Sequence, residues 1–203
     1  MVATKDRNTG SVLSAIIPTR ESERTLVPTL ASLVAGAADG MLREVIIADG
    51  GSKDATAEVA DVAGCRLLTL PGPLGARLKA ASASARAQWL LFLRPGITLD
   101  EGWVREAARF ISANEAQNSG DPSAAVFRPG SAAGRPVLVE ALSLLRVALG
   151  GSPHPEQGLI IAKRAYERLD GHRDHAETER DLLRRIGRRR IVMLRAGAVA
   201  APE

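Results

Sequence analysis

Two apolar runs in the first quarter of the chain lead directly into polar residues that can bind a ligand. Asp49 follows the β-branched run at 44–48, and the chain turns at once through Gly50. The run at 11–17 leads in the same way into the polar segment 18–21. An ionised carboxylate at a strand end accepts hydrogen bonds from a base or a ribose, and open α/β folds bind ligands at this edge of the sheet. The two runs therefore predict strands whose tips form a nucleotide pocket.

Asp49 also has an interpretation that needs no ligand. An aspartate before a glycine turn often shapes the turn and caps the next helix. Ser52 and Asp54 follow closely and are suited to the same capping. Because these two side chains are available for that purpose, we favour contact between Asp49 and a nucleotide and keep capping as the alternative.

Strands and helices alternate through the first half of the chain. Strands are predicted at 11–17, 44–48, 66–70 and 89–93, and helices at 23–35, 55–63 and 75–86. Strands that are separated by helices of this length pair in parallel through right-handed crossovers. We therefore expect an α/β fold with a mostly parallel central sheet flanked by helices.

The pattern is less regular after residue 100. Residues 118–123 and 128–135 are rich in Gly, Pro, Ser and Asn and are predicted as loops. Helices are predicted at 101–113, 136–149, 163–169 and 176–186, and strands at 158–162 and 190–194. Residues 1–10 have no periodic pattern, so we expect a loose amino-terminal extension before a single domain at 11–203.

The composition fits one globular domain in a reducing compartment. The chain has 203 residues and only 3% aromatic residues, so its core is expected to rest on Ala, Val, Leu and Ile. Cys65 is the single cysteine and cannot form an internal disulfide. No apolar run approaches the roughly 20 residues that span a bilayer, and the chain opens without a signal-like segment. We therefore expect a cytoplasmic protein.

Charge and histidine spacing limit the classes of ligand. The net charge of +4 would suit nucleic acid, but the scarcity of aromatic residues removes stacking platforms, so nucleic acid is not expected as a partner. A dinucleotide oxidoreductase is disfavoured because no glycine-rich turn follows the first strand. The histidines, His154, His172 and His175, are too irregularly spaced for a zinc site and are expected at the surface.

Arginines crowd the carboxyl end of the chain. They are Arg184, Arg185, Arg188, Arg189, Arg190 and Arg195. Such a cluster can hold phosphates or anionic lipid, and lipid would place the protein peripherally at the inner membrane face. The alternative is a solvated helix end whose arginines complement the helix dipole. The sequence leaves both interpretations open.

Several motifs in the same order resemble those of family 2 glycosyltransferases, most of all the short bacterial members. The motifs lie at 16–21, 45–56, 75–77, 89–93, 156–159 and 177–186, so the resemblance covers roughly residues 11–200. It implies the GT-A fold, the Rossmann-like fold of nucleotide-diphospho-sugar transferases. It also implies inverting transfer from a nucleotide-sugar donor to a sugar or lipid acceptor that the motifs do not identify. Residues 11–100 would then be the nucleotide-binding half and 101–203 the acceptor-side half.

The resemblance assigns donor contacts to the strand tips and to the helix predicted at 75–86. The residues are Pro18, Thr19, Glu21, Asp49, Gly50 and Arg77. Arg77 matches a basic residue that faces the diphosphate, and a guanidinium can grip phosphate oxygens bidentately. Glu21 has an alternative place in the first turn of a helix, where it would complement the dipole. On the acceptor side the resemblance assigns Glu156 and Gln157, the latter as a hydrogen-bonding partner for a sugar hydroxyl.

The sequence departs from the family directly after the strand at 89–93. Family members place an Asp-x-Asp, or at least one aspartate, here to hold Mg or Mn, whereas this chain reads Arg94-Pro95-Gly96. We therefore expect no metal ligands at this position and a weak or absent metal dependence. Arg94 can replace the metal as the positive charge that stabilises the departing diphosphate. Two alternatives stay open: a noncatalytic module that binds a nucleotide or a protein partner, and a strand-end arginine that merely reaches solvent.

Inverting transfer also needs a general base for the acceptor hydroxyl. By the resemblance, Glu179 stands at the base position, and Thr178 replaces the glutamate that precedes it in relatives. Acidic residues at a helix start are also ordinary dipole compensation, and both interpretations stay open. Glu179 and Arg94 are thus the candidate catalytic residues.

Overall fold

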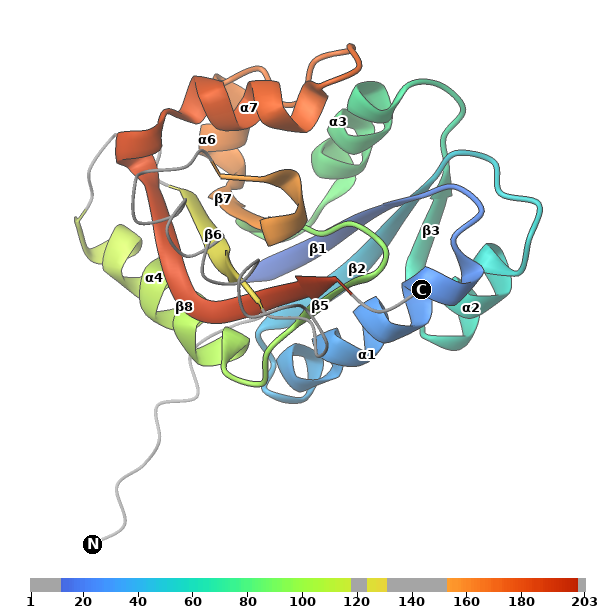
Figure 1. Cartoon of the computed structure of the whole chain (residues 1–203), viewed down its shortest axis with the longest axis horizontal. Coiled ribbons are helices and arrows are strands. Elements are labelled where there is room, and N and C mark those ends of the chain that lie inside the picture. The colour runs from blue at the N-terminus through green and yellow to red at the C-terminus, as the bar shows by residue number, and fades with distance from the viewer. Residues whose placement is uncertain (1–11, 118–123, 131–152, 201–203) are drawn as a thin grey trace, which may run out of the picture.

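Eight strands form one sheet in the computed structural model, which describes residues 12–117, 124–130 and 153–200. The strands are β1 (Leu13–Thr19), β2 (Leu42–Asp49), β3 (Arg66–Thr69), β4 (Trp89–Phe92), β5 (Ile97–Leu99), β6 (Ala124–Pro129), β7 (Leu159–Ala162) and β8 (Ile191–Ala200). Their order is β3-β2-β1-β4-β7-β6-β8-β5 (Figure 1). The predicted extension at 1–10, loop at 118–123 and helix at 136–149 lie outside the described residues.

Helices lie on both sides of this sheet (Figure 1). They are α1 (Glu23–Ala38), α2 (Thr56–Val62), α3 (Leu74–Ser84), α4 (Trp103–Gln117), α6 (Lys163–Arg168) and α7 (Thr178–Ile186), with the short 3₁₀ turns η1 (Pro155–Gln157) and η2 (Arg188–Arg190). The described helices that were predicted are present, with ends shifted by a few residues. Helices on both faces bury the parallel strands, which is why these strands read as continuous apolar runs.

The first four strands in the chain form the parallel half of the sheet, as predicted. β1 pairs in parallel with β2 on one side and with β4 on the other, and β2 pairs in parallel with β3. Leu13, Ile16 and Ile17 of β1 are completely buried at the centre. Because the strands run in one direction, the chain leaves β1, β2 and β4 at the same edge, and the polar residues that follow them meet there.

The second half of the sheet is mixed and was only partly predicted. β7 pairs antiparallel with β4 and β6, and β8 pairs in parallel with β6 and antiparallel with β5. β5 and β6 were not predicted, and the loop expected at 128–135 begins inside β6, where Arg128 pairs with Gly197. β8 also extends to Ala200, well beyond the predicted 190–194. Short strands with distant partners leave little periodic signal in the chain.

Gly36 in α1 makes room for Trp103, the largest fully buried side chain of the core. Trp103 at the start of α4 is completely buried, and its Nε1 donates to Ser32 O at 3.0 Å. A Cβ atom at Gly36 would lie 2.4 Å from the Trp103 ring. A core rich in aliphatic residues was predicted, and this indole fits only because α1 carries a glycine at the point of contact.

Candidate functional site

The tips of β1 and β2 lie side by side at the carboxyl edge of the sheet. Thr19 pairs with Asp49 in the strand register, and Thr19 Oγ1 donates a hydrogen bond of 2.9 Å to Asp49 Oδ1. The Gly50 N–H donates to Thr19 O at 2.9 Å. Pro18 lies one position earlier, where β1 still pairs with β2. Three of the residues predicted at the donor site, Thr19, Asp49 and Gly50, are therefore in contact with one another.

The Asp49 carboxylate is buried and bound to the protein through both oxygens. Oδ1 accepts from the Thr19 and Ser52 hydroxyls at 2.9 and 2.5 Å, and Oδ2 accepts from the Gly51 and Ser52 backbone N–H groups, each at 2.8 Å. Burial alone would raise the pKa of Asp49, but the hydrogen bonds from Ser52, Thr19 and Gly51 outweigh it and hold the pKa below its usual value. Asp49 thus forms the turn, as its alternative interpretation states, and its contact with a nucleotide stays a prediction.

Hydrogen bonds join the loops that follow β1 and β2. The Glu21 N–H donates to Ser52 Oγ, and the Lys53 N–H donates to Glu21 Oε1, both at 2.8 Å. Further along, the Glu23 N–H donates to Asp54 Oδ2 at 3.0 Å. These bonds link residues about thirty positions apart in the chain, with separations of 31 and 32. The two loops therefore form one braced wall beside the strand tips.

Glu21 shapes this wall through its backbone. It lies outside α1, which begins at Glu23, so its alternative place in the first helical turn is wrong. Its φ angle of 51° falls in the left-handed region that residues other than glycine seldom adopt. Strained backbone of this kind is typical of functional loops and persists only where neighbouring contacts hold it, here those of Ser52 and Lys53.

Arg77 of α3 is a buried cation placed across the ends of both strands. Its Nη1 donates to Thr19 O at 2.8 Å and to Ala48 O at 2.9 Å, and a Cβ atom at Gly50 would lie 2.9 Å from it. Burial lowers the pKa of Arg77, although the nearby Asp49 carboxylate opposes the shift. Its buried Nε–H has no hydrogen-bond partner among the described residues. Arg77 therefore brings positive charge to the predicted nucleotide site, while its unpartnered Nε–H is enclosed by the protein.

The two predicted catalytic residues are paired with each other. Arg94 Nε lies 3.1 Å from Glu179 Oε1 and 3.0 Å from Oε2, and Arg94 Nη2 also contacts Oε2. The residues are 85 positions apart, Arg94 in the connection from β4 to β5 and Glu179 in the first turn of α7. The Glu179 side chain is 15% exposed and that of Arg94 41%. These bonds raise the pKa of Arg94, against the opposing effect of burial.

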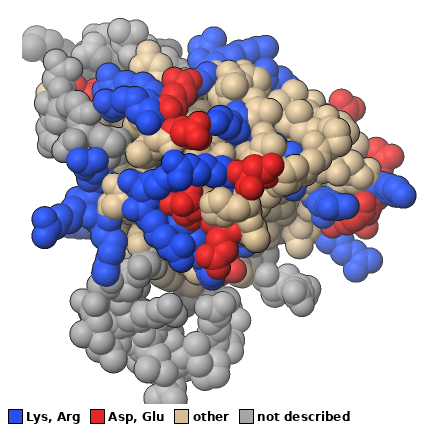
Figure 2. All heavy atoms as spheres, turned by 90° about the horizontal axis from the view of Figure 1, so that it is seen from above, with Lys and Arg blue, Asp and Glu red and all other residues tan. Residues whose placement is uncertain are grey.

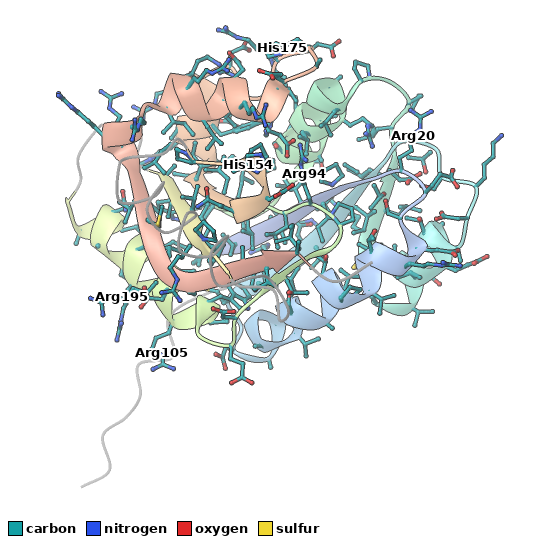
Figure 3. The ribbon with its side chains drawn as sticks, viewed as in Figure 1. Arg20, Arg94, Arg105, His154, His175 and Arg195 are labelled. Carbon is teal, nitrogen blue, oxygen red and sulfur yellow. The ribbon has the colours of Figure 1, made fainter. Side chains whose placement is uncertain are left out.

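A cavity of about 260 Å³ opens beside this ion pair. Its lining includes Arg94, His154, Pro155, Glu177, Glu179 and Arg180. Arg94 and His154 lie near one another in the middle of the molecule, whereas His175 lies at its rim (Figure 3). Arg180 Nη1 pairs with Glu177 Oε1 at 3.2 Å, an (i, i+3) contact on α7, so their spacing in the sequence is the signal that could have placed Arg180 at this cavity.

The two predicted acceptor residues have different environments. Gln157 is buried, its Nε2 donates to Phe127 O at 2.8 Å, and its Oε1 accepts from the His154 N–H at 2.6 Å. Both ends of its amide therefore hold η1 against β6, and its contact with a sugar hydroxyl stays a prediction. Glu156 is exposed and lies 3.5 Å from the His154 ring. Its contact with an acceptor stays a prediction.

His172 is buried, so its predicted place at the surface is wrong. Only 3% of it is exposed, and its Nδ1 lies 2.9 Å from the Tyr166 hydroxyl. Burial, reinforced by the positive charge of Arg185, lowers the pKa of His172 to about 3. The ring packs edge-on against Phe92 of β4. The sequence holds no signal for this burial, because it depends on α6 and the β4 strand packing around the ring.

The carboxyl-terminal arginines do not form a single patch. Arg185 is mostly buried and donates to Asp181 Oδ2 at 2.7 Å, and Arg195 lies beside α4, where its N–H donates to Glu106 (Figure 3). Arg188 and Arg189 are exposed in η2, which directly precedes β8. Seen from the α7 side, basic side chains lie in groups with acidic ones between them (Figure 2). Among the described residues, no helix is long and apolar enough to cross a bilayer.

The residues at the family's metal position do not fit a divalent cation. A guanidinium stands there and is bound to the nearest carboxylate, that of Glu179. Asp100, the next acidic residue along the chain, accepts a 2.7 Å hydrogen bond from the Gly197 N–H and so fixes β8. Within the described ranges, no three His, Cys, Asp or Glu side chains are grouped as a metal site would require.

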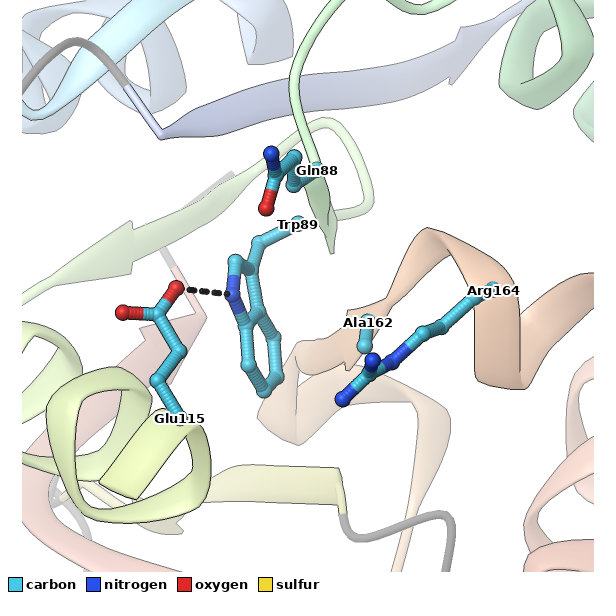
Figure 4. A pocket seen from close by; sticks show the side chains of 5 residues that line it. All are labelled: Gln88, Trp89, Glu115, Ala162 and Arg164. Carbon is cyan, nitrogen blue, oxygen red and sulfur yellow. Dashed lines mark hydrogen bonds between the residues drawn. The ribbon is translucent and has the colours of Figure 1, made fainter. Parts of the chain in front are cut away.

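Two further cavities lie away from the strand tips. One of about 390 Å³ is lined by Trp89 and Arg164, and Trp89 Nε1 donates to Glu115 Oε1 at 3.3 Å (Figure 4). Trp89 begins β4, so this cavity lies at the opposite edge of the sheet from Arg94. The other, about 570 Å³, is an apolar groove between α1 and α2. Neither has the charged groups that converge at the tips of β1, β2 and β4.

The curled mixed sheet flanked by helices, with its polar cluster at the shared carboxyl edge, defines a GT-A fold. The family model described as glycosyl transferase family 2 matches residues 14–148, and the chain belongs to this family. Comparison with curated proteins found no match.

Solved structures share this fold. TarS of S. aureus has a TM-score of 0.68 at 15% identity, over 94% of this chain and 60% of that chain. Glucosyl-3-phosphoglycerate synthase from Mycobacterium tuberculosis has a TM-score of 0.65 at 20% identity, over 96% of this chain and 73% of that chain. The present chain thus spans only 60% of TarS. TarS has been crystallised with UDP-GlcNAc, and the synthase with Mn²⁺, UDP and glucosyl-3-phosphoglycerate.

Proposed function

We propose that this protein transfers a sugar from a nucleotide-sugar donor to an acceptor hydroxyl, with inversion at the anomeric carbon and without a bound metal. The observation that carries the proposal is the cluster of Thr19, Asp49 and Arg77, where a buried cation lies against the tips of two parallel strands. Membership of family 2 and the nucleotide complexes of TarS and the synthase support a nucleotide ligand at this edge.

On this proposal the two braced loops hold the nucleoside, and the arginines hold the diphosphate. Glu21 and Pro18 border the base, while Arg77 donates to phosphate oxygens from its buried position. A partly desolvated guanidinium forms strong, charge-assisted hydrogen bonds with phosphate. Arg94 lies nearer the acceptor-side cavity and stabilises the negative charge that develops on the leaving diphosphate.

Transfer then needs a single displacement at the anomeric carbon. The acceptor oxygen forms a bond to that carbon while the bond from the carbon to the diphosphate oxygen breaks. The electron pair of the broken bond leaves with the nucleoside diphosphate, and Glu179 takes the proton of the acceptor hydroxyl. The cavity lined by Glu177, Glu179 and Arg180 is the place for the acceptor.

A second candidate is a noncatalytic module that binds a nucleotide or a protein partner. One observation favours it: both oxygens of Glu179 are engaged by Arg94, so the carboxylate assigned as the base is already bound to the protein. Donor turnover separates the candidates. Hydrolysis or transfer of the sugar supports the enzyme, and nucleotide binding without either supports the module.

Removing the Arg77 guanidinium is expected to weaken binding of UDP or GDP at least about 10-fold, because one charge-assisted hydrogen bond contributes about 1.5–3 kcal/mol. Isothermal titration of Arg77→Met against the parent protein measures this. Arg66→Met is the matched control, since Arg66 is also a partly buried arginine but begins β3 at the opposite edge. Equal losses in both variants would contradict the assignment, as would abolition of parent binding by EDTA.

We propose an anionic membrane surface as a second partner. Arg188 and Arg189 of η2 would contact the lipid head groups, together with Val192 and Met193 at the start of β8, whose exposed fractions are 48% and 39%. Basic residues at an anionic surface contribute about 1 kcal/mol each, so Arg188→Glu with Arg189→Glu should reduce binding to phosphatidylglycerol vesicles by at least about 10-fold. Vesicle co-sedimentation measures this, with phosphatidylcholine vesicles as the control. Equal binding to both lipids would contradict the prediction.

A further inference from the structure

The Nε–Nη2 side of Arg94 can bind either Glu179 or a diphosphate bidentately but not both at once, and this competition carries an inference that rests on the proposed function. Arg94 Nε and Nη2 contact both carboxylate oxygens, and this is the bidentate arrangement that a phosphate would also use. Glu179, in turn, would use one of these two oxygens to take the proton of the acceptor hydroxyl. The two residues that the transfer requires are therefore paired with each other in this structure.

We propose that Arg94 exchanges partners during the reaction. Without donor it binds Glu179 and keeps that carboxylate from accepting a proton. When a nucleotide diphosphate enters, Arg94 turns to the phosphate oxygens, and Glu179 becomes free to act as the base. The general base is thereby released only when the donor is present.

The geometry favours such an exchange. Arg94 is the more exposed member of the pair, at 41% against 15% for Glu179, and the 260 Å³ cavity adjoins it. A diphosphate carries more negative charge than a single carboxylate, and a guanidinium bound to either keeps charge-assisted hydrogen bonds. Glu179 keeps its position after the exchange, because it lies in the first turn of α7, whose Leu182, Leu183 and Ile186 are buried.

Thermodynamic coupling between the two residues tests the exchange. In Glu179→Gln, Arg94 loses its charged partner, so UDP should bind at least 5-fold more tightly than to the parent protein, as measured by isothermal titration. Uridine, which has no phosphate, should bind equally to both proteins. In an Arg94→Met background, Glu179→Gln should leave the affinity for UDP unchanged, because the guanidinium that it releases is absent.

Glu177→Gln is the matched control for loss of negative charge. Glu177 lines the same cavity but pairs with Arg180 and Arg184 instead of Arg94. An equal gain from Glu177→Gln, a gain that persists with Arg94→Met, or no gain from Glu179→Gln would each overturn the exchange while leaving the proposed function intact. Failure of UDP and GDP to bind both the parent and Glu179→Gln would overturn the proposed function and the exchange together.

Discussion

Replacing Asp49 with alanine should lower the free energy of unfolding by about 3 kcal/mol, because four donors lose a buried ionised acceptor. For a domain of this size, that corresponds to a fall in melting temperature of roughly 6–12 °C. Thermal unfolding followed by circular dichroism measures the change.

The control for this variant is Asp39→Ala. Asp39 is an exposed aspartate at the carboxyl end of α1, where surface substitutions change stability by no more than about 0.5 kcal/mol. If the melting temperatures of Asp49→Ala and Asp39→Ala differed by less than about 2 °C, the hydrogen bonds of Asp49 would contribute little to stability. Nucleotide binding by Asp49→Ala must accordingly be measured well below its melting temperature.

Acidification should destabilise the protein through His172. The pKa of His172 is about 3 in the folded protein and about 6.5 when the chain is unfolded. The unfolded state therefore binds an extra proton below pH 6.5, so stability falls as the pH is lowered from 6.5 toward 3. Between pH 7 and pH 5 the expected loss from this residue is about 2 kcal/mol, or roughly 4–8 °C in melting temperature.

His172→Gln isolates this contribution. Glutamine keeps a hydrogen-bonding group near the Tyr166 hydroxyl but does not titrate, and all other ionisable groups are shared by the two proteins. The surrounding charges are those of Arg185, which lowers the pKa of His172, and Asp181, which raises it. Melting temperatures at pH 7 and pH 5 should differ less for His172→Gln than for the parent protein. If the change in melting temperature between pH 7 and pH 5 were the same for both proteins, His172 would be protonated in the folded protein at pH 5.

Local signals were sufficient to predict the parallel half of the fold. The centres of β1 and β2 are pairs of consecutive isoleucines that are buried on both faces, and such strands can be recognised without knowledge of their partners. The register that sets Thr19 beside Asp49 follows from two such strands ending at one edge. By contrast, β5 and β6 are short, and their partner β8 comes about 65 or more residues later in the chain. No pattern near Ile97 or Ala124 indicates that partner.

The roles of individual polar groups were harder to predict than their positions. Asp49 and Gln157 were expected to face ligands, and the structure shows that both also form hydrogen bonds within the protein. A side chain's residue type states which bonds it can form, and only the packing around it states which of them are already used. The buried Gln157 and His172 are examples in which a polar residue type predicts exposure and the interior supplies partners instead.

By itself the sequence determined the family and the alternation of strands and helices in the parallel half of the sheet. It also determined that Arg94 stands where relatives carry a metal-binding aspartate. Only the tertiary structure decided that Arg94 binds Glu179. The two residues lie 85 positions apart, in a loop after β4 and at the start of α7, and neither segment carries a signal for the other. Their contact arises because buried apolar side chains seat α7 over the carboxyl edge of the sheet, and opposite charges brought together there form hydrogen bonds.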